Sequence, residues 1–122
     1  PLLCGGLDPV AEREMIALLH SERWTGHPAL RYAVLPTTSP ASPDFRARAY
    51  WRGPSWPVIN WFFVWMLERR GLPAVARPLR RAALEQLAEG SLAEYYEPFT
   101  GEGLGSAAQS WTAAAALDLL LT

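Results

Sequence analysis

The fold is decided by the stretch YWRGPSWPVINWFFVWMLERRG, which spans residues 50–71. Pro57 suits the first position of a helix, because its fixed φ is helical and the amide hydrogen that it lacks would have no partner there. Gly71 suits the position just after a helix, where a left-handed backbone is common. Apolar side chains surround most of the segment between them, which is typical of a helix buried on several sides. The stretch therefore predicts a buried helix over residues 57–70, entered through a proline-stiffened loop.

Three further helices are predicted on either side of this segment. An Asp-Pro pair at a typical helix start predicts one over residues 9–20. Another is expected over about residues 74–89, where Pro78 requires either a start nearer Arg77 or a kinked first turn. The last, over about residues 109–121, is rich in Ala, which permits close helix packing. No period-two strand of useful length is present, so the sequence predicts the all-α class.

Two long loops, residues 21–49 and 94–108, separate the helices. The first is rich in Pro, Ser and Thr, and the second is rich in Gly. Loops of this length are uncommon in compact domains, and those that occur often bind ligands. In a barrel of helical hairpins the long loops gather at one end and form a pocket. We therefore expect the functional residues at the ends of these loops.

Two segments about forty residues apart carry side chains suited to carbohydrate. One has two indoles and a guanidinium, and the other sets a carboxylate beside phenols: Trp51, Arg52, Trp56, Glu94 and Tyr95. Aromatic rings stack on the apolar faces of sugars, and Arg and carboxylate groups bind hydroxyls by charge-assisted hydrogen bonds. A carboxylate in such a pocket is also the usual catalytic group for cleaving a glycosidic bond. The two segments therefore predict carbohydrate chemistry.

Composition narrows the classes of function. The chain has 122 residues, half of them apolar, which suits one domain or a piece of a larger one. Its net charge of −1 gives no reason to expect nucleic acid or an anionic membrane as a partner. Cys4 is the single cysteine, and His20 and His27 lack ligands at metal spacing, so we expect neither an internal disulfide nor a metal site. With no membrane-length apolar run and no visible targeting segment, we expect a cytoplasmic location.

Several motifs in a fixed order resemble the C-terminal third of the (α/α)6-toroid glycosidases. They are YWRGPxWP at residues 50–57, NW at 60–61, EYY at 94–96, TGEG at 100–103 and SWTA at 110–113. Their order and spacing are most similar to glycoside hydrolase family 63, which includes mannosyl-oligosaccharide glucosidase and the mannosylglycerate and glucosylglycerate hydrolases. Trehalases share the toroid, but they carry an Asp where this chain has Arg52. They also have a longer glycine-rich stretch after the Glu-x-Tyr unit.

The resemblance implies an inverting α-glycoside hydrolase, in which one carboxylate activates water and a second carboxylic acid protonates the leaving oxygen. Glu94, the first residue of the Glu-x-Tyr unit, falls in the place of the general base. The family's acid is an Asp upstream of this chain, since neither Asp8 nor Asp44 lies in a matching motif. No metal or organic cofactor is implied. The implied substrate is a small α-glucoside or α-mannoside, such as mannosylglycerate or glucosylglycerate.

On this interpretation, residues 1–122 are a single C-terminal fragment of the catalytic domain, a portion of the toroid made of helical hairpins with long pocket-forming loops. A first residue other than Met fits a chain cut from a longer one. Because the acid is missing, we expect these residues to be inactive alone. Their expected partners are a small carbohydrate and either the remainder of the toroid or another copy of the chain.

Each candidate residue also has a structural interpretation. If Glu94 is not the general base, it is a solvated acidic residue in a loop. One of Trp51 and Trp56 is expected to face the sugar, with Trp51 favoured, and the other to pack in the core. Arg52 either binds a sugar hydroxyl, an acidic aglycone or Glu94, or forms a structural ion pair at a helix start.

Three more residues complete the expected substrate-binding set. Tyr95 is placed to exclude bulk water from Glu94. Gln109 and Trp111 lie where the second long loop enters the last helix. Trp111 either lines the floor of the pocket or packs in the core. Tyr50 has no assigned role.

Two other functions remain open at this point. One is a non-catalytic carbohydrate-binding module that keeps the aromatic pocket without the acid. Sugar binding without turnover that persists after Glu94→Gln would identify it. The other is an inactive structural fragment, whose exposed apolar edges would make it self-associate.

Overall fold

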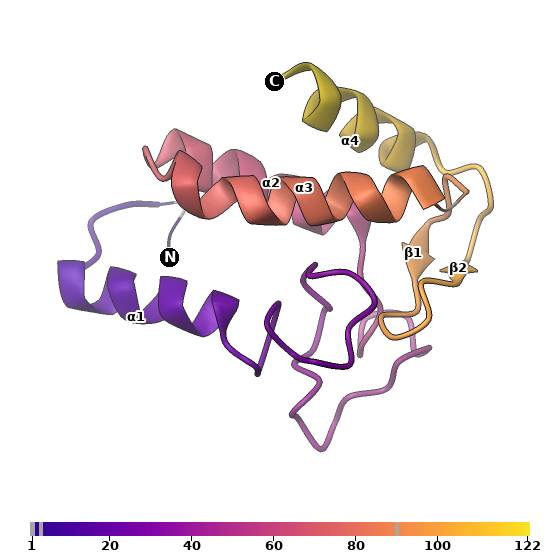
Figure 1. Ribbon diagram of the computed structural model, residues 1–122, viewed down its shortest axis with the longest axis horizontal. Helices are drawn as coiled ribbons and strands as arrows, with labels where there is room; N and C mark the ends of the chain where they lie inside the picture. The colour runs from indigo at the N-terminus through magenta and orange to yellow at the C-terminus, as the bar shows by residue number, and fades with distance from the viewer. Residues whose placement is uncertain (1, 3, 90) are drawn as a thin grey trace.

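The structure, a computed structural model, describes residues 2, 4–89 and 91–122. These residues form four helices and one antiparallel ladder (Figure 1), with the bounds α1 Pro9–His20, α2 Pro57–Arg69, α3 Pro73–Glu89, β1 Tyr95–Tyr96, β2 Gly103–Leu104 and α4 Ser110–Leu121. The predicted all-α class is confirmed, and each helix begins and ends within one residue of its predicted position. The ladder is too short for a period-two pattern to reveal it in the sequence.

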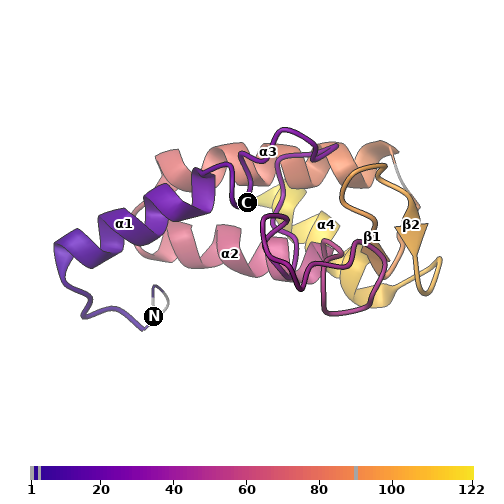
Figure 2. The same cartoon turned by 90° about the horizontal axis from the view of Figure 1, so that it is seen from below.

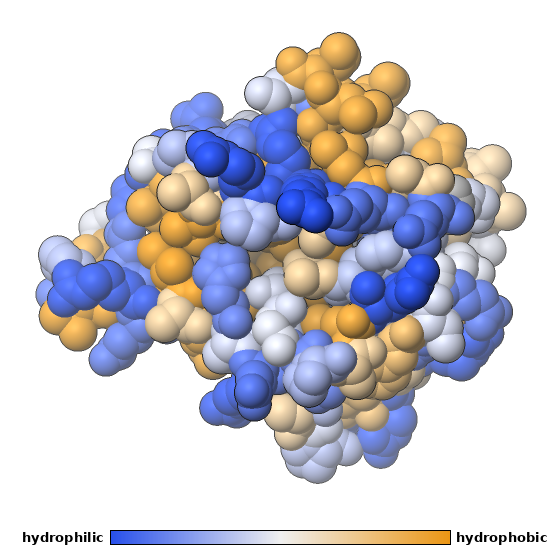
Figure 3. All heavy atoms as spheres, in the orientation of Figure 1, coloured by the Kyte–Doolittle hydropathy of each residue, from blue (hydrophilic) through white to orange (hydrophobic). Residues whose placement is uncertain are grey.

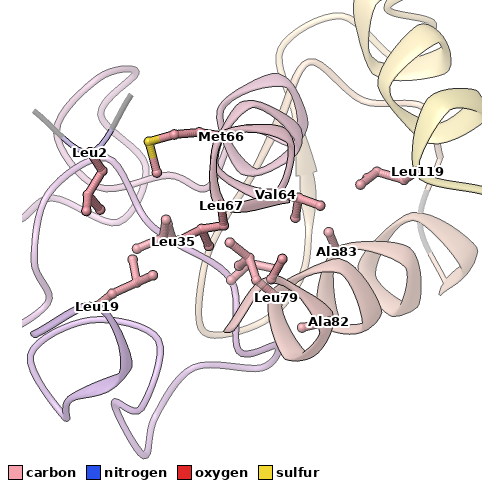
Figure 4. Packing of buried hydrophobic residues seen from close by; sticks show 12 residues of the cluster. Leu2, Leu19, Leu35, Val64, Met66, Leu67, Leu79, Ala82, Ala83 and Leu119 are labelled. Carbon is pink, nitrogen blue, oxygen red and sulfur yellow. The ribbon is translucent and has the colours of Figure 1, made fainter. Parts of the chain in front are cut away.

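The helices α2 and α3 lie side by side and hold the core. Gly71, at φ +72°, makes the turn between them as predicted. Leucine, valine and alanine side chains from the two helices interlock (Figure 4), among them Val64, Leu67, Leu79 and Ala83. Pro78 lies inside α3, which begins at Pro73, so of the two alternatives for this helix the start nearer Arg77 is wrong. Its missing amide hydrogen is tolerated on the exposed side of the helix, away from the core.

The helix α4 packs across α2 and α3 and is fastened by Arg80. The guanidinium donates to Leu119 O at 2.9 Å and to Glu68 Oε1 at 2.6 Å, which joins three helices at one point. The end of α4 also carries leucines whose side chains are largely exposed. Figure 3 shows the resulting apolar surface at the top of the molecule, which includes Leu117, Leu120 and Leu121.

The helix α1 begins at the predicted cap and lies beside the α2–α3 pair (Figure 2). The Asp8 carboxylate accepts hydrogen bonds from the amides of Val10 and Ala11, which satisfies two donors at the helix start. Glu12 then pairs with Arg70 at 2.6 Å and joins α1 to the end of α2. Leu19 contributes the buried side chain of this helix.

The long loop between α1 and α2 is ordered by Asn60, which is fully buried in α2. Its Oδ1 accepts from Leu35 N–H at 2.7 Å, and its Nδ2 donates to Leu35 O and Trp56 O, both at 3.1 Å. Asn60 thereby fixes the loop against the start of α2. Figures 1 and 2 show this loop and the β1–β2 ladder at the same end of the helix pair.

Two general findings concern the described part of the chain. None of its helices is both long and apolar enough to span a bilayer. No group of three His, Cys, Asp or Glu side chains comes together there as a set of metal ligands.

Candidate active site

The two segments with carbohydrate-binding side chains are paired through their backbones. Ser55 N–H donates to Tyr96 O at 3.0 Å, and Tyr96 N–H donates to Ser55 O at 2.9 Å. Ser55 also bridges to Pro36, on the long loop held by Asn60. The loop before α2 and the β1–β2 hairpin therefore form one continuous surface at the start of α2.

Three aromatic rings are stacked in this surface. The indoles of Trp51 and Trp56 have centroids 3.8 Å apart and planes 9° apart, and Trp56 stacks in turn on Tyr95 at 4.9 Å. Tyr50 meets all three rings edge-on. Trp56 is fully buried in the middle, whereas Trp51 is 47% exposed. Trp51 is therefore the indole with a free face, and Trp56 supports it from beneath.

Glu94 lies at the edge of the stack and is held by two donors. Tyr50 Oη donates to Glu94 Oε1 at 2.7 Å, and Ser106 N–H donates to Glu94 Oε2 at 3.2 Å. The preceding Gly105 has φ +72°, and a Cβ there would lie 2.5 Å from Glu94 Oε2. Only glycine fits at this position. Residues with a side chain rarely adopt this left-handed backbone, and a Cβ would also clash with the carboxylate.

The sequence alone did not reveal the roles of Tyr50 and Gly105 in supporting Glu94. The signal for Tyr50 is its place next to Trp51 in the aromatic loop, which does not reveal that the phenol reaches a carboxylate 44 positions later. Gly105 is one of several glycines in its loop, and the need for a glycine at this position follows only from the position of Glu94.

The contact with Glu94 predicts a raised pKa for the Tyr50 phenol. The hydrogen bond to the carboxylate, and secondarily burial, favour the protonated phenol, so the pKa lies above its ordinary value of about 10. We expect an ultraviolet difference titration of the wild type against Tyr50→Phe to show one phenol that ionises above pH 10. In a Glu94→Gln background this pKa should return toward the ordinary value. Ionisation at the ordinary pKa in the wild type would contradict the contact.

Four acidic residues lie in or beside this surface, and Glu94 differs from the other three. Asp44 and Glu102 each pair with an arginine. Glu97 is buried and caps a turn through bonds to the backbone and side chain of Thr100. Among the residues that the structure describes, Glu94 has no cationic partner. Its carboxylate can therefore accept a proton without breaking an ion pair.

Arg52 lies apart from Glu94. Its guanidinium is 3.6 Å from the Asp44 carboxylate, and more than half of each side chain is exposed. In the described chain it donates no hydrogen bond to Glu94. The structure thus shows an ion pair for Arg52, within the loop rather than at the helix start. Its binding to a sugar or an acidic aglycone stays a prediction.

Gln109 and Trp111 enter the site from the start of α4. Gln109 is the N-cap, since its side-chain oxygen accepts from Ser110 N–H at 3.1 Å. Its own N–H donates to Leu92 O at 2.8 Å, just before the hairpin. Trp111 meets Trp56 edge-on at 5.9 Å and is 41% exposed. The start of α4 therefore closes one side of the aromatic stack.

Two hollows flank the stack, each with one exposed indole in its wall. Trp51 lines a hollow of about 320 Å³ together with Trp24 and Thr37. Trp111 lines another of about 380 Å³ together with Trp61 and Asp118. Both volumes are typical of small-molecule sites. The structure thus brings the predicted aromatic residues together but turns their two exposed indoles into different hollows.

Comparison with known proteins identifies the family. Residues 1–112 match the family model described as the mannosylglycerate hydrolase MGH1-like glycoside hydrolase domain. The chain belongs to this family. The resemblance to family 63 glycosidases that the motifs predicted is thereby confirmed.

Two curated relatives are similar along nearly the whole chain. A glucosylglycerate hydrolase from Mycolicibacterium hassiacum is 59% identical over 98% of the chain. A mannosylglycerate hydrolase from Thermus thermophilus is 39% identical over 96% of it. In both cases the match covers 27% of the relative, so the chain spans about a quarter of the length of these enzymes.

Solved structures of the family confirm the fold. A GH63 mannosylglycerate hydrolase from Thermus thermophilus, in complex with glucose, superimposes with a TM-score of 0.76 at 37% identity. The match covers 98% of this chain and 28% of that one. The same enzyme in complex with Tris and D-glycerate gives a TM-score of 0.76 at 36% identity. The chain therefore has the fold of a portion of an (α/α)6 toroid, as predicted.

Proposed function

We propose that the chain is part of the catalytic domain of a longer inverting glycoside hydrolase that cleaves glucosylglycerate or mannosylglycerate. The observation that carries the proposal is the Glu94 carboxylate, held by Tyr50 and Ser106 beside an aromatic stack and free of a cationic partner in the described chain. The relatives named glucosylglycerate and mannosylglycerate hydrolase support the substrate class, with glucosylglycerate favoured by the 59% identity.

In this proposal Glu94 is the general base. It removes a proton from a water molecule as the water oxygen attacks the anomeric carbon, while a carboxylic acid from the remainder of the enzyme protonates the departing glycerate oxygen. Each Glu94 oxygen accepts one hydrogen bond in the structure, and a carboxylate oxygen can accept a second, which leaves room for the water. An inverting enzyme holds its two carboxyl groups roughly 6.5–9.5 Å apart to fit that water.

The other predicted site residues have separate proposed roles. Trp51 offers its free face to a sugar ring, supported by Trp56, while Tyr95 screens the base from bulk water. Gln109 and Trp111 complete the wall at the start of α4. The reaction needs neither a metal nor an organic cofactor, and the proposed location is the cytoplasm.

The test is hydrolysis by the full-length protein that carries this chain, with glucosylglycerate and mannosylglycerate as separate substrates. Proton NMR of the first product identifies the anomer before it equilibrates. We expect release of glycerate and a β-configured sugar, faster from glucosylglycerate. An α-configured first product would exclude inversion, and no release from either glycoside would exclude the proposed substrates.

The same full-length protein can be used to distinguish a sugar-binding module from a hydrolase. A module would bind the glycosides by calorimetry without releasing glycerate, and Glu94→Gln would leave that binding unchanged. The exposed leucines at the end of α4 instead favour a chain that packs against further protein, either the rest of the toroid or another copy.

A further inference from the structure

Besides the bond from Tyr50 to Glu94, a second side-chain contact joins the loop before α2 to the β1–β2 hairpin. Arg48 Nη1 donates to Glu102 Oε2 at 2.5 Å, and Arg48 Nη2 donates to Glu102 Oε1 at 3.1 Å. Planar two-pronged pairs of this kind fix both distance and orientation. Arg48 lies only two residues before Tyr50, whose hydroxyl holds Glu94. The contact therefore acts on the same short piece of loop that supports the proposed base.

The two contacts lie at opposite ends of the β1–β2 hairpin. At one end Glu94 N–H donates to Ser106 O, and at the turn end Glu97 N–H donates to Glu102 O at 2.9 Å. Tyr50 reaches the first end and Arg48 the second. Beyond the Ser55–Tyr96 backbone pairing, these two side-chain contacts fasten the loop along the hairpin, so its angle to the hairpin is fixed as well as its distance.

The backbone bonds between Ser55 and Tyr96 also join the loop to the hairpin, whereas the aromatic contacts between the two segments are less directional. Phe45 packs against Phe99 with centroids 5.4 Å apart, and Tyr50 packs edge-on against Tyr95 at 5.2 Å. Such contacts tolerate sliding, whereas a two-pronged ion pair does not. In the described chain, Arg48–Glu102 is the ion pair that joins these two segments.

The charges of the pair are stable under assay conditions. The hydrogen bonds and positive charge of Arg48 lower the pKa of the Glu102 carboxyl, and Glu102 raises the pKa of Arg48. Both side chains are more than half exposed, so the pair is screened by salt and contributes little to global stability. Breaking it should therefore change the local geometry without unfolding the protein.

We propose that Arg48 and Glu102 are positioning residues for Glu94, because their ion pair sets the loop that presents the Tyr50 hydroxyl to the carboxylate. This inference rests on the proposed function for its kinetic consequence. In the described chain neither member of the pair makes a side-chain hydrogen bond to Glu94.

The test compares Arg48→Met and Glu102→Gln with the control Arg81→Met in the full-length protein. Arg81 forms a similar exposed ion pair with Glu85 on α3, remote from the site. We expect each site variant to lower kcat about five-fold with KM unchanged, in line with the loss of one exposed pair. The double variant should be no worse than either single one, and charge reversal, Arg48→Glu with Glu102→Arg, should restore part of kcat.

Other outcomes would overturn the inference. If Arg48→Met raises KM for the glycerate-bearing substrate and Glu102→Gln does not, Arg48 binds the substrate carboxylate directly. If both variants match the control, the pair is a surface contact without a positioning role.

A readout independent of turnover separates this inference from the proposed function. Loosening the loop weakens the bond from Tyr50 to Glu94, so both variants should lower the pKa of the Tyr50 phenol toward its ordinary value. A wild type that hydrolyses neither glycoside would overturn the proposed function alone. An unchanged Tyr50 pKa in both variants would overturn the positioning role even in an active enzyme.

Discussion

Glu94→Gln is expected to lower kcat for glycoside hydrolysis about 1,000-fold in the full-length protein, because an amide cannot take a proton from the attacking water. The fold should be unaffected. A glutamine oxygen can still accept from Ser106 N–H, and its amide can donate to the Tyr50 hydroxyl oxygen, so both neighbours keep a partner. The loss should therefore appear in kcat, with substrate affinity little changed.

The measurement is glycerate release under saturating substrate, together with substrate binding by calorimetry. Glu14→Gln is the matched control, since Glu14 is exposed on α1 and remote from the site. The control should retain full activity. If Glu94→Gln kept more than a tenth of the wild-type kcat, Glu94 would not be the general base, and lost affinity at unchanged kcat would make it a binding residue.

Asn60→Leu is expected to lower the free energy of unfolding by about 3 kcal/mol. Leucine has nearly the same size, but it leaves Leu35 N–H and two carbonyl oxygens buried without the partners that Asn60 provides. Because Leu35 is itself buried, water cannot replace these bonds without opening the core. The loop that carries Pro36 should then separate from the start of α2.

Urea unfolding of the full-length protein, followed by circular dichroism, measures this effect. Thr38→Val is the control, because it also replaces a polar loop side chain by an apolar one but removes no hydrogen bond in the described chain. We expect the control to unfold within about 0.5 kcal/mol of the wild type. An equally stable Asn60→Leu protein would show that the three bonds to Asn60 do not hold the loop.

The helices could be predicted because their signals are local. The cap at Asp8, the proline at Pro57 and the left-handed glycine at Gly71 each act within one turn of the chain. The tolerated Pro78 was harder to place, because its cost depends on which side of α3 faces the core. The ladder of β1 and β2 carries no periodic signal, since it contains two residues per strand.

The site was predictable only as a set of residue types. The motifs named Trp51, Trp56 and Glu94 as candidates, and the order of the motifs identified the family that the comparisons confirm. Trp51 was favoured over Trp56 as the indole that faces the sugar, but the motifs held no physical reason for its exposure. That depends on Trp56 being covered by Trp51 on one side and by Tyr95 on the other.

The positions of the helix ends and the residue types in the two loops could be read from the sequence alone, since both follow from residues close together in the chain. The tertiary structure alone decided that the Tyr50 hydroxyl meets Glu94, that Gly105 must lack a side chain and that Arg48 reaches Glu102. The contacts of Tyr50 and Arg48 join segments about 40 to 55 residues apart and depend on how the loop, held by Asn60, lies along the hairpin. No local pattern records that placement, because it results from the packing of the whole chain.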